Sequence, residues 1–162
     1  MIALLNIVLA IPLIFIYIQD NRDRAVHVFW FVIAAALSIS IFILNEIQLK
    51  DLMLNLAFAS VLVILLFVYI SLKEQKWTNI FKTHFGLGDF VFLLAVAPLF
   101  SLRNYVLFIV SGMFFSALVH IIRYGKEVDK SIPLAGYLGV YVIGLKTTEV
   151  FVAQFNFYAD LV

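Results

Sequence analysis

Long apolar runs alternate with short polar segments along the whole chain. A helix needs about 20 mostly apolar residues to cross the hydrocarbon layer of a bilayer, with a range of about 17 to 25. The pattern therefore predicts six membrane-spanning helices, at Ile2–Ile18, Val28–Leu44, Leu52–Leu72, Phe90–Leu102, Tyr105–Ile122 and Ile132–Phe151. We expect an all-α, polytopic integral membrane protein in which residues 1–162 form a single bundle of six transmembrane helices.

The fourth predicted span is short and contains Pro98. A single helix from Phe90 to Ile122 would be roughly 50 Å long, too long for one crossing. We therefore expect two helices, with the break at Arg103–Asn104. Asn55 lies one turn inside the third span, where a polar side chain is expected to bond a neighbouring helix.

Composition supports the assignment to a membrane. Apolar residues make up 65% of the chain and charged residues 13%, with a mean hydropathy of +1.10, which is more apolar surface than a soluble domain of this size can hide. The net charge of +1 and the lack of a basic patch interleaved with aromatic residues argue against a nucleic-acid partner. The absence of cysteine excludes a disulfide framework, a thiolate zinc site and a cysteine nucleophile.

Lysine and arginine set the expected orientation, because cytoplasmic loops hold an excess of both. Eight of the eleven fall in the first, third and fifth loops, and the other side has Lys50, Arg103 and Lys146. We therefore expect these three loops to face the cytoplasm and both termini to face out. The first span lacks a basic segment before it and a cleavage pattern after it, so we expect it to be retained.

Two aspartates, Asp20 and Asp89, each lie where a predicted cytoplasmic loop meets a span. Two carboxylates held close together cannot both ionise cheaply, so such a pair can act as base and acid on a bound water. A structural interpretation stays open, in which Asp89 is a helix N-cap and Asp20 forms an interfacial ion pair with Arg22. Asp23 is an alternative to Asp20 for the first position of the pair.

The residues around the second aspartate, Gly86-Leu87-Gly88-Asp89, match the G-x-G-D signature of intramembrane aspartyl proteases. Over nearly all of its length the chain resembles the peptidase core of the type IV prepilin peptidase family. In that family the first aspartate precedes a short basic stretch, as in Asp20-Asn21-Arg22-Asp23-Arg24, and a later span begins with a turn similar to Ile132-Pro133-Leu134-Ala135-Gly136.

The resemblance implies an aspartyl endopeptidase of the bacterial inner membrane, without cofactor, that removes the basic leader of a pilin-like precursor at the cytoplasmic face. Asp20 and Asp89 would be catalytic, and Gly86, Gly88 and Arg24 would contact the substrate. The chain has His27 where the family usually has proline and Val91 where it usually has lysine. It also lacks the cysteine-rich domain that methylates the product in longer family members, so methylation is not expected.

Other interpretations use different residues. His27, His84 and His120 fall near the predicted cytoplasmic face, but no zinc-binding spacing joins them, and we expect no metal. Gly112-x-x-x-Ser116 and Ala34-x-x-x-Ser38 fit either packing within the chain or a homodimer. A non-catalytic assembly scaffold with the peptidase fold is the main competing function. A transporter would need more ionisable residues within the bilayer.

Overall fold

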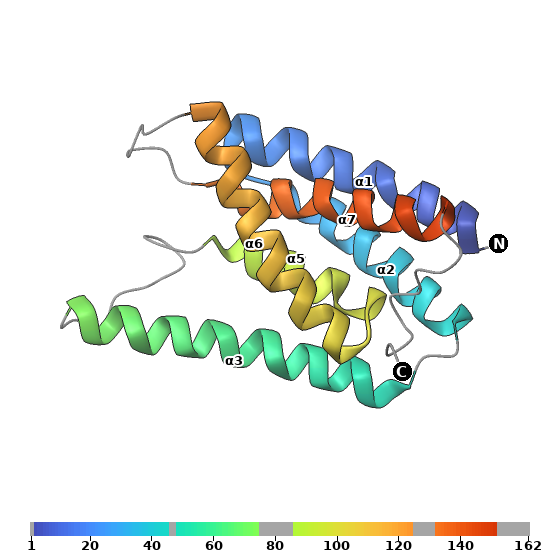
Figure 1. Ribbon diagram of the computed structural model, residues 1–162, viewed down its shortest axis with the longest axis horizontal. Coiled ribbons are helices and arrows are strands. Elements are labelled where there is room, and N and C mark those ends of the chain that lie inside the picture. Colours follow the sequence, from blue (N-terminus) through green and yellow to red (C-terminus); the bar gives the residue numbers. More distant parts are fainter. Residues whose placement is uncertain (1, 46–47, 75–85, 125–131, 152–162) are drawn as a thin grey trace.

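The computed structural model describes residues 2–45, 48–74, 86–124 and 132–151, and this part of the chain is almost entirely helical, without a strand. Its elements, in chain order, are α1 (Ile2–Asp23), α2 (Val28–Leu44), α3 (Leu49–Glu74), α5 (Leu87–Val96), the 3₁₀ turn η1 (Ala97–Leu99), α6 (Leu102–Tyr124) and α7 (Leu134–Phe151) (Figure 1). The predicted all-α class is confirmed for these residues.

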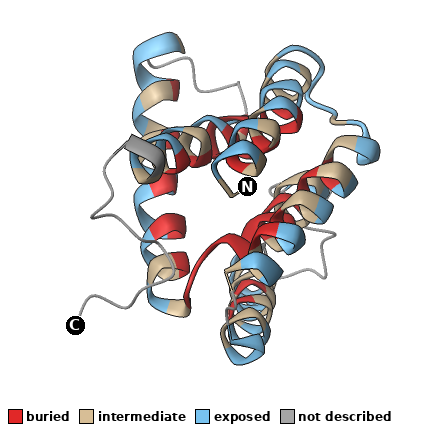
Figure 2. Ribbon diagram, turned by 90° about the vertical axis from the view of Figure 1, so that its right-hand side faces the viewer, coloured by how far each residue is buried: buried red, intermediate tan, exposed pale blue. Residues whose placement is uncertain are grey.

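Three helices, α1, α3 and α6, are long and apolar enough to cross a membrane. The apolar helices α2 and α5 with η1 are shorter, so the count of six spans stays a prediction. Large apolar side chains are exposed along the outer faces of the helices, while the buried positions face inward (Figure 2). An outward apolar surface of this kind suits contact with lipid.

Helix α1 packs between α2 and α7. It buries Leu9, Leu13 and Ile16 on one side, at the three- and four-residue spacing that places side chains on one helical face. Helix α5 packs on α2, α6 packs on α7, and α3 is joined to the rest through α5, η1 and α6. In Figure 1, α3 accordingly runs along one side of the molecule.

The predicted break between the fourth and fifth spans is real, but the predicted position at Arg103–Asn104 is wrong. Both residues lie inside α6, and the helix is interrupted earlier, over Ala97–Ser101. Pro98 explains the position, because it lacks the N–H that continues a helix and its ring clashes with the preceding turn.

Two neighbouring helices satisfy the carbonyls at this break. The Asn55 Nδ2 group donates to the Ala97 oxygen at 3.0 Å and to the Phe100 oxygen at 2.8 Å. The Lys146 ammonium, buried on α7, donates to the Leu99 oxygen at 3.4 Å. The expectation that Asn55 bonds another helix is therefore confirmed, and its partner is the irregular segment itself.

The small-residue motifs pack within the chain. A Cβ on Gly112 would lie 2.5 Å from Leu138 Cδ2, so glycine there lets α6 approach α7. Ser116 is buried on the same helix, and Ala34 and Ser38 are buried on α2. Both motifs therefore serve packing inside the protomer, and a homodimer would have to use other surfaces.

Candidate active site

Asp20 lies near the C-terminal end of α1 and points toward α7. Its Oδ2 accepts a hydrogen bond from the Gly136 backbone N–H at 2.7 Å. A Cβ on Gly136 would lie 3.2 Å from Asp20 Cβ and 3.3 Å from Tyr17 Cα, so glycine allows α1 to approach α7 this closely. Helix α1 ends shortly after Asp20, and Arg24 follows with φ 54°, the left-handed conformation common after a helix C-terminus.

Asp89 is the third residue of α5, in the first turn after the N-cap Gly86. Its Oδ2 accepts the Gly86 N–H at 3.2 Å, and its Oδ1 accepts the Ala135 N–H of α7 at 2.8 Å. A Cβ on Gly86 would lie 2.9 Å from Asp89 Oδ2, so this glycine gives the carboxylate its room. The corresponding position on Gly88 is 3.5 Å from Phe31 Cζ, an ordinary contact, so crowding does not demand the second glycine.

The two carboxylates meet at the N-terminus of α7. Ala135 and Gly136 are adjacent residues of its first turn, where backbone N–H groups have no partner within the helix. Asp89 accepts from the first N–H and Asp20 from the second. The structure thus brings together side chains from α1 and α5, 69 positions apart in the sequence. The partial positive charge of the helix end also favours anions there.

Asp89 lies just before the apolar run that starts at Phe90. Burial raises the pKa of its carboxyl to about 6. The hydrogen bond from Ala135 acts in the opposite direction, the negative charge of Asp20 raises the pKa further, and the bond from Gly86 lowers it. Acid and base catalysis by two carboxyls requires one proton on the pair, and the raised pKa of Asp89 brings it closer to this charge state than an ordinary aspartate.

Asp23, the alternative to Asp20, lies elsewhere. Its carboxylate pairs with Arg22 Nε at 3.2 Å, and the Asp23 side chain is 53% exposed. The structure therefore selects Asp20 as the partner of Asp89, and the alternative ion pair between Asp20 and Arg22 is replaced by the one between Arg22 and Asp23. The positive charge of Arg24 acts on Asp20 from an exposed position.

The structure also places His27 and Val91, two other positions singled out in the sequence. The His27 backbone N–H donates to Gln19 Oε1 at 2.9 Å, which holds the turn between α1 and α2. Val91 packs against the hydrophobic core. Among the described residues no three His, Asp or Glu side chains are grouped as metal ligands, and His84 lies outside those residues.

The simple capping interpretation of Asp89 is wrong in one respect. The N-cap of α5 is Gly86, and Asp89 stabilises the first turns of two different helices. Ala135 and Gly136 complete the site and were not predicted as site residues. The signal in the sequence is the turn Ile132-Pro133-Leu134-Ala135-Gly136, which was matched to the start of a later span without a role for Ala135 or Gly136.

No family model matches the chain, and neither a curated protein nor a solved structure shows significant similarity to it.

Proposed function

We propose that the protein is a membrane aspartyl endopeptidase with Asp20 and Asp89 as its catalytic pair. The observation that carries this proposal is the pair of hydrogen bonds from adjacent amides of α7, which hold two carboxylates from distant parts of the chain together. The raised pKa of Asp89 supports it, because the carboxyl then keeps its proton up to about pH 6, well above the range of an ordinary aspartate.

The reaction follows from one shared proton. The ionised carboxylate takes a proton from a bound water, and the water oxygen attacks the carbonyl carbon of the scissile peptide bond. The protonated carboxyl gives its proton to the amide nitrogen as the C–N bond breaks, which leaves a new carboxyl terminus and a new amine. The amides of Ala135 and Gly136 orient the two carboxyls.

The substrate class we propose is a pilin-like precursor, cleaved between its basic leader and its apolar helix at the cytoplasmic face of a bacterial inner membrane. The Gly-Leu-Gly-Asp segment supports this proposal, because its first glycine makes room for the Asp89 carboxylate. The three helices that are long and apolar enough to cross a membrane also support it. The six-span topology with both termini outside belongs to this proposal.

Cleavage of co-expressed pilin-like precursors tests the proposal. Native protein is compared with Asp20→Asn and Asp89→Asn at matched membrane levels, and Asp23→Asn is the control, since Asp23 is paired with Arg22 away from α7. We expect cleavage by the native protein and the control but not by the other two. Full activity of either Asp20→Asn or Asp89→Asn would refute the proposal.

A non-catalytic scaffold is the second candidate, and one observation favours it. Every hydrogen bond described for the two carboxylates goes to a backbone N–H at a helix start, as in ordinary structural capping. A scaffold predicts that Asp20→Asn and Asp89→Asn variants, present at normal levels, support pilus or secretion-system assembly in cells. Loss of assembly with intact protein levels would exclude it.

A further inference from the structure

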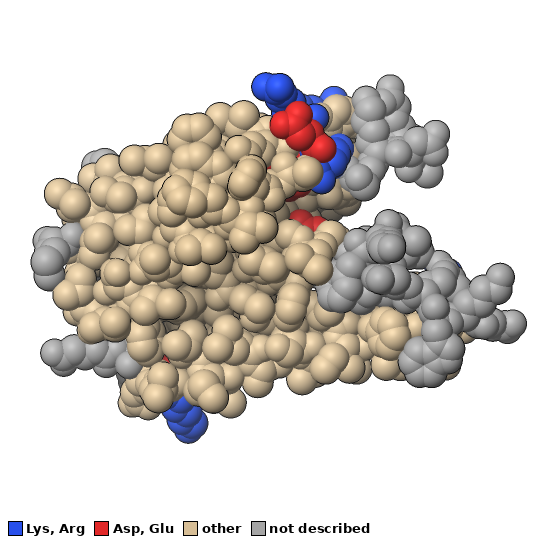
Figure 3. Space-filling view, turned by 180° about the vertical axis from the view of Figure 1, so that it is seen from behind, with Lys and Arg blue, Asp and Glu red and all other residues tan. Residues whose placement is uncertain are grey.

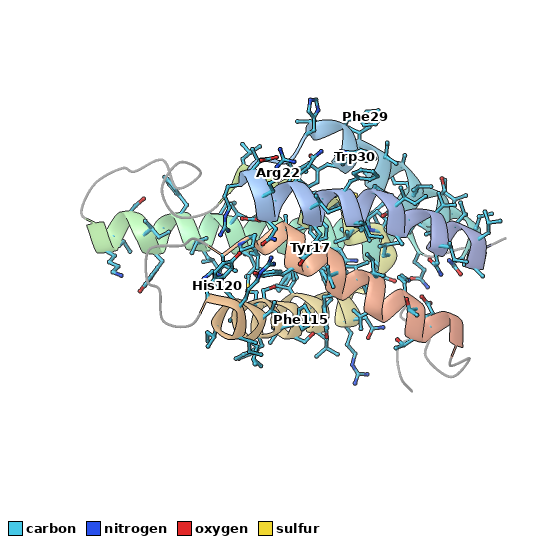
Figure 4. All side chains as sticks on the ribbon, turned by 90° about the horizontal axis from the view of Figure 1, so that it is seen from above. Tyr17, Arg22, Phe29, Trp30, Phe115 and His120 are labelled. Carbon is cyan, nitrogen blue, oxygen red and sulfur yellow. The ribbon has the colours of Figure 1, made fainter. Side chains whose placement is uncertain are left out.

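A second group of polar side chains lies where the ends of α1 and α6 meet. Arg123 Nη1 donates to Tyr17 Oη at 3.3 Å, and Tyr124 Oη donates to Asn21 Oδ1 at 3.5 Å. Tyr137 of α7 lies beside Tyr17, with 6.4 Å between their ring centroids. Figure 4 labels Tyr17 in this part of the molecule. None of these contacts involves the aspartate pair.

Arg123 carries a positive charge that no described acidic side chain neutralises. Its guanidinium carbon lies 5.5 Å from the centroid of the Tyr124 ring, a cation–π distance, and its side chain is exposed. Arg22 and Lys146 differ in this respect, since each forms an ion pair with a carboxylate. The tyrosines therefore hold the guanidinium in place while the side chain, which has five N–H donors, stays exposed.

The position along α6 indicates what meets this charge. Ile121 and Ile122, which directly precede Arg123, are 60% and 77% exposed on a helix long and apolar enough to cross a membrane. Arginine and tyrosine at the end of such a helix lie at the level of the lipid head groups. The exposed Arg22 and Arg24 lie near the end of α1. Figure 3 shows several basic side chains together with acidic ones near one end of the molecule, and a further basic side chain apart from them.

We infer that Arg123, with Tyr17 and Tyr124, forms a site for the phosphate of an anionic phospholipid. The Arg123 guanidinium supplies charge-assisted donors that a phosphate oxygen accepts, and the Tyr17 hydroxyl, which accepts from Arg123, can donate its own O–H. Tyr124 contributes its ring, which holds the guanidinium, while its O–H donates to Asn21. The exposed isoleucines next to them are suited to acyl chains, so charge and apolar surface lie together as they do in a lipid. A free phosphate would use only the polar half of the site.

Thermal unfolding of the purified protein in neutral detergent tests this inference. Phosphatidylglycerol should raise the Tm by several degrees and phosphatidylcholine should not, because a ligand that binds only the folded state stabilises it. Arg123→Gln and Tyr17→Phe should lose at least half of the shift. Arg103→Gln removes an exposed arginine from the opposite end of α6 and should keep the shift.

Three results would overturn the inference. They are an equal shift from phosphatidylcholine, a full phosphatidylglycerol shift in Arg123→Gln, and an equal shift from inorganic phosphate at the same concentration, which would identify a site for the free anion. Counting bound lipids by native mass spectrometry gives an independent readout if a variant unfolds at a lower temperature. Arg123→Gln should then carry fewer bound phosphatidylglycerol molecules than Arg103→Gln.

Discussion

At the scale of the residue, Asp89 shows how position determines chemistry. A carboxylate in the first turn of a helix is usually a stabilising group, since it complements the helix dipole. The Asp89 carboxylate accepts hydrogen bonds from the backbone N–H groups of Gly86 and Ala135, at the starts of two helices. Burial nevertheless raises its pKa to about 6. Desolvation therefore outweighs two hydrogen bonds, and the second carboxylate, Asp20, acts in the same direction as burial.

This balance predicts how stability depends on pH. The pKa of Asp89 rises from its ordinary 3.8 to about 6 on folding, so the folded protein binds a proton more tightly than the unfolded chain. Its contribution to stability is complete below about pH 4 and is lost as the pH rises through 6, a difference of roughly 3 kcal/mol.

The check is a series of unfolding midpoints between pH 4 and pH 7. The native protein should lose stability relative to Asp89→Asn across this range, because asparagine cannot ionise. Parallel curves for the two proteins would show that Asp89 does not titrate as described.

Gly136 gives a second prediction at this scale. An alanine there would bring its Cβ to 3.2 Å from Asp20 and 3.3 Å from the Tyr17 backbone, so α1 must move away from α7. We expect the free energy of unfolding to fall by about 1 to 3 kcal/mol. The rate of precursor cleavage should fall by more than the smaller amount of folded protein explains.

The matched control for Gly136 is on the same helix. In the described part of the chain, no atom outside the helix's own backbone lies within 4 Å of a Cβ on Gly144, and alanine is the better helix former by up to about 1 kcal/mol. Gly144→Ala should therefore leave cleavage unchanged and stability equal or higher, as measured by denaturant unfolding. Equal behaviour of the two variants would mean that close contact at Gly136 is unimportant.

At the scale of the element, the break at Ala97–Leu99 joins three parts of the fold. The break ends α5, the helix that bears Asp89. One side chain from α3 and one from α7 donate hydrogen bonds to the backbone carbonyls of the break. Asn55 accounts for two of these bonds from a fully buried position. The position of α5 therefore depends on a side chain far from the aspartate pair.

Replacing Asn55 tests that dependence. Asn55→Ala leaves two buried carbonyl oxygens without this donor, and we expect a loss of about 2 to 4 kcal/mol. Ser60→Ala is the control on the same helix, since the hydrogen bond described for Ser60 Oγ goes to the Leu56 carbonyl of its own helix, and should change stability by less than 1 kcal/mol. The measurement is detergent-solubilised unfolding by denaturant, and similar midpoints for both variants would contradict this role.

The sequence predicted the helices better than their ends. The expected range for α2 matches the structure, because polar or turn residues flank its apolar run on both sides. The expected start of α6 was three residues late, because Arg103 and Asn104 look like a break although the interruption comes from Pro98. Local polarity indicates where a helix leaves the membrane, whereas Pro98 changes the backbone itself.

The site was predictable only in part. Asp20 and Asp89 stand out because each follows or precedes an apolar run. The amides of Ala135 and Gly136 carry no signal of their own, since any helix start has free N–H groups. The contact between Tyr17 and Arg123 joins residues 106 positions apart, and nothing in the local pattern of either residue indicates it.

At the scale of the whole molecule, the aspartate pair and the Arg123 group lie at the same end of the bundle, joined through α1 and the first turn of α7. In the proposed topology this end faces the cytoplasm. A substrate that enters from the lipid would meet the carboxylates at the membrane surface, where water is also available.

The absence of cysteine makes the topology easy to test. Single cysteines at the exposed positions Arg24 and Lys50 can be labelled with a membrane-impermeant maleimide. We expect Lys50→Cys to react in cells whose inner membrane is intact, and Arg24→Cys to react only after that membrane is permeabilised. The reverse pattern would place the aspartate pair on the outer side.

The central claim is that Asp20 and Asp89 act as one unit, and the most direct measurement compares single and double substitutions. Rates of precursor cleavage are measured for the purified native protein, Asp20→Asn, Asp89→Asn and the double variant in one lipid mixture. When two groups share one proton, replacing either one disables both, so the effects of the two substitutions do not add. Each single variant should therefore be as inactive as the double variant. A single variant with substantial activity, or losses that multiply in the double variant, would contradict a catalytic pair.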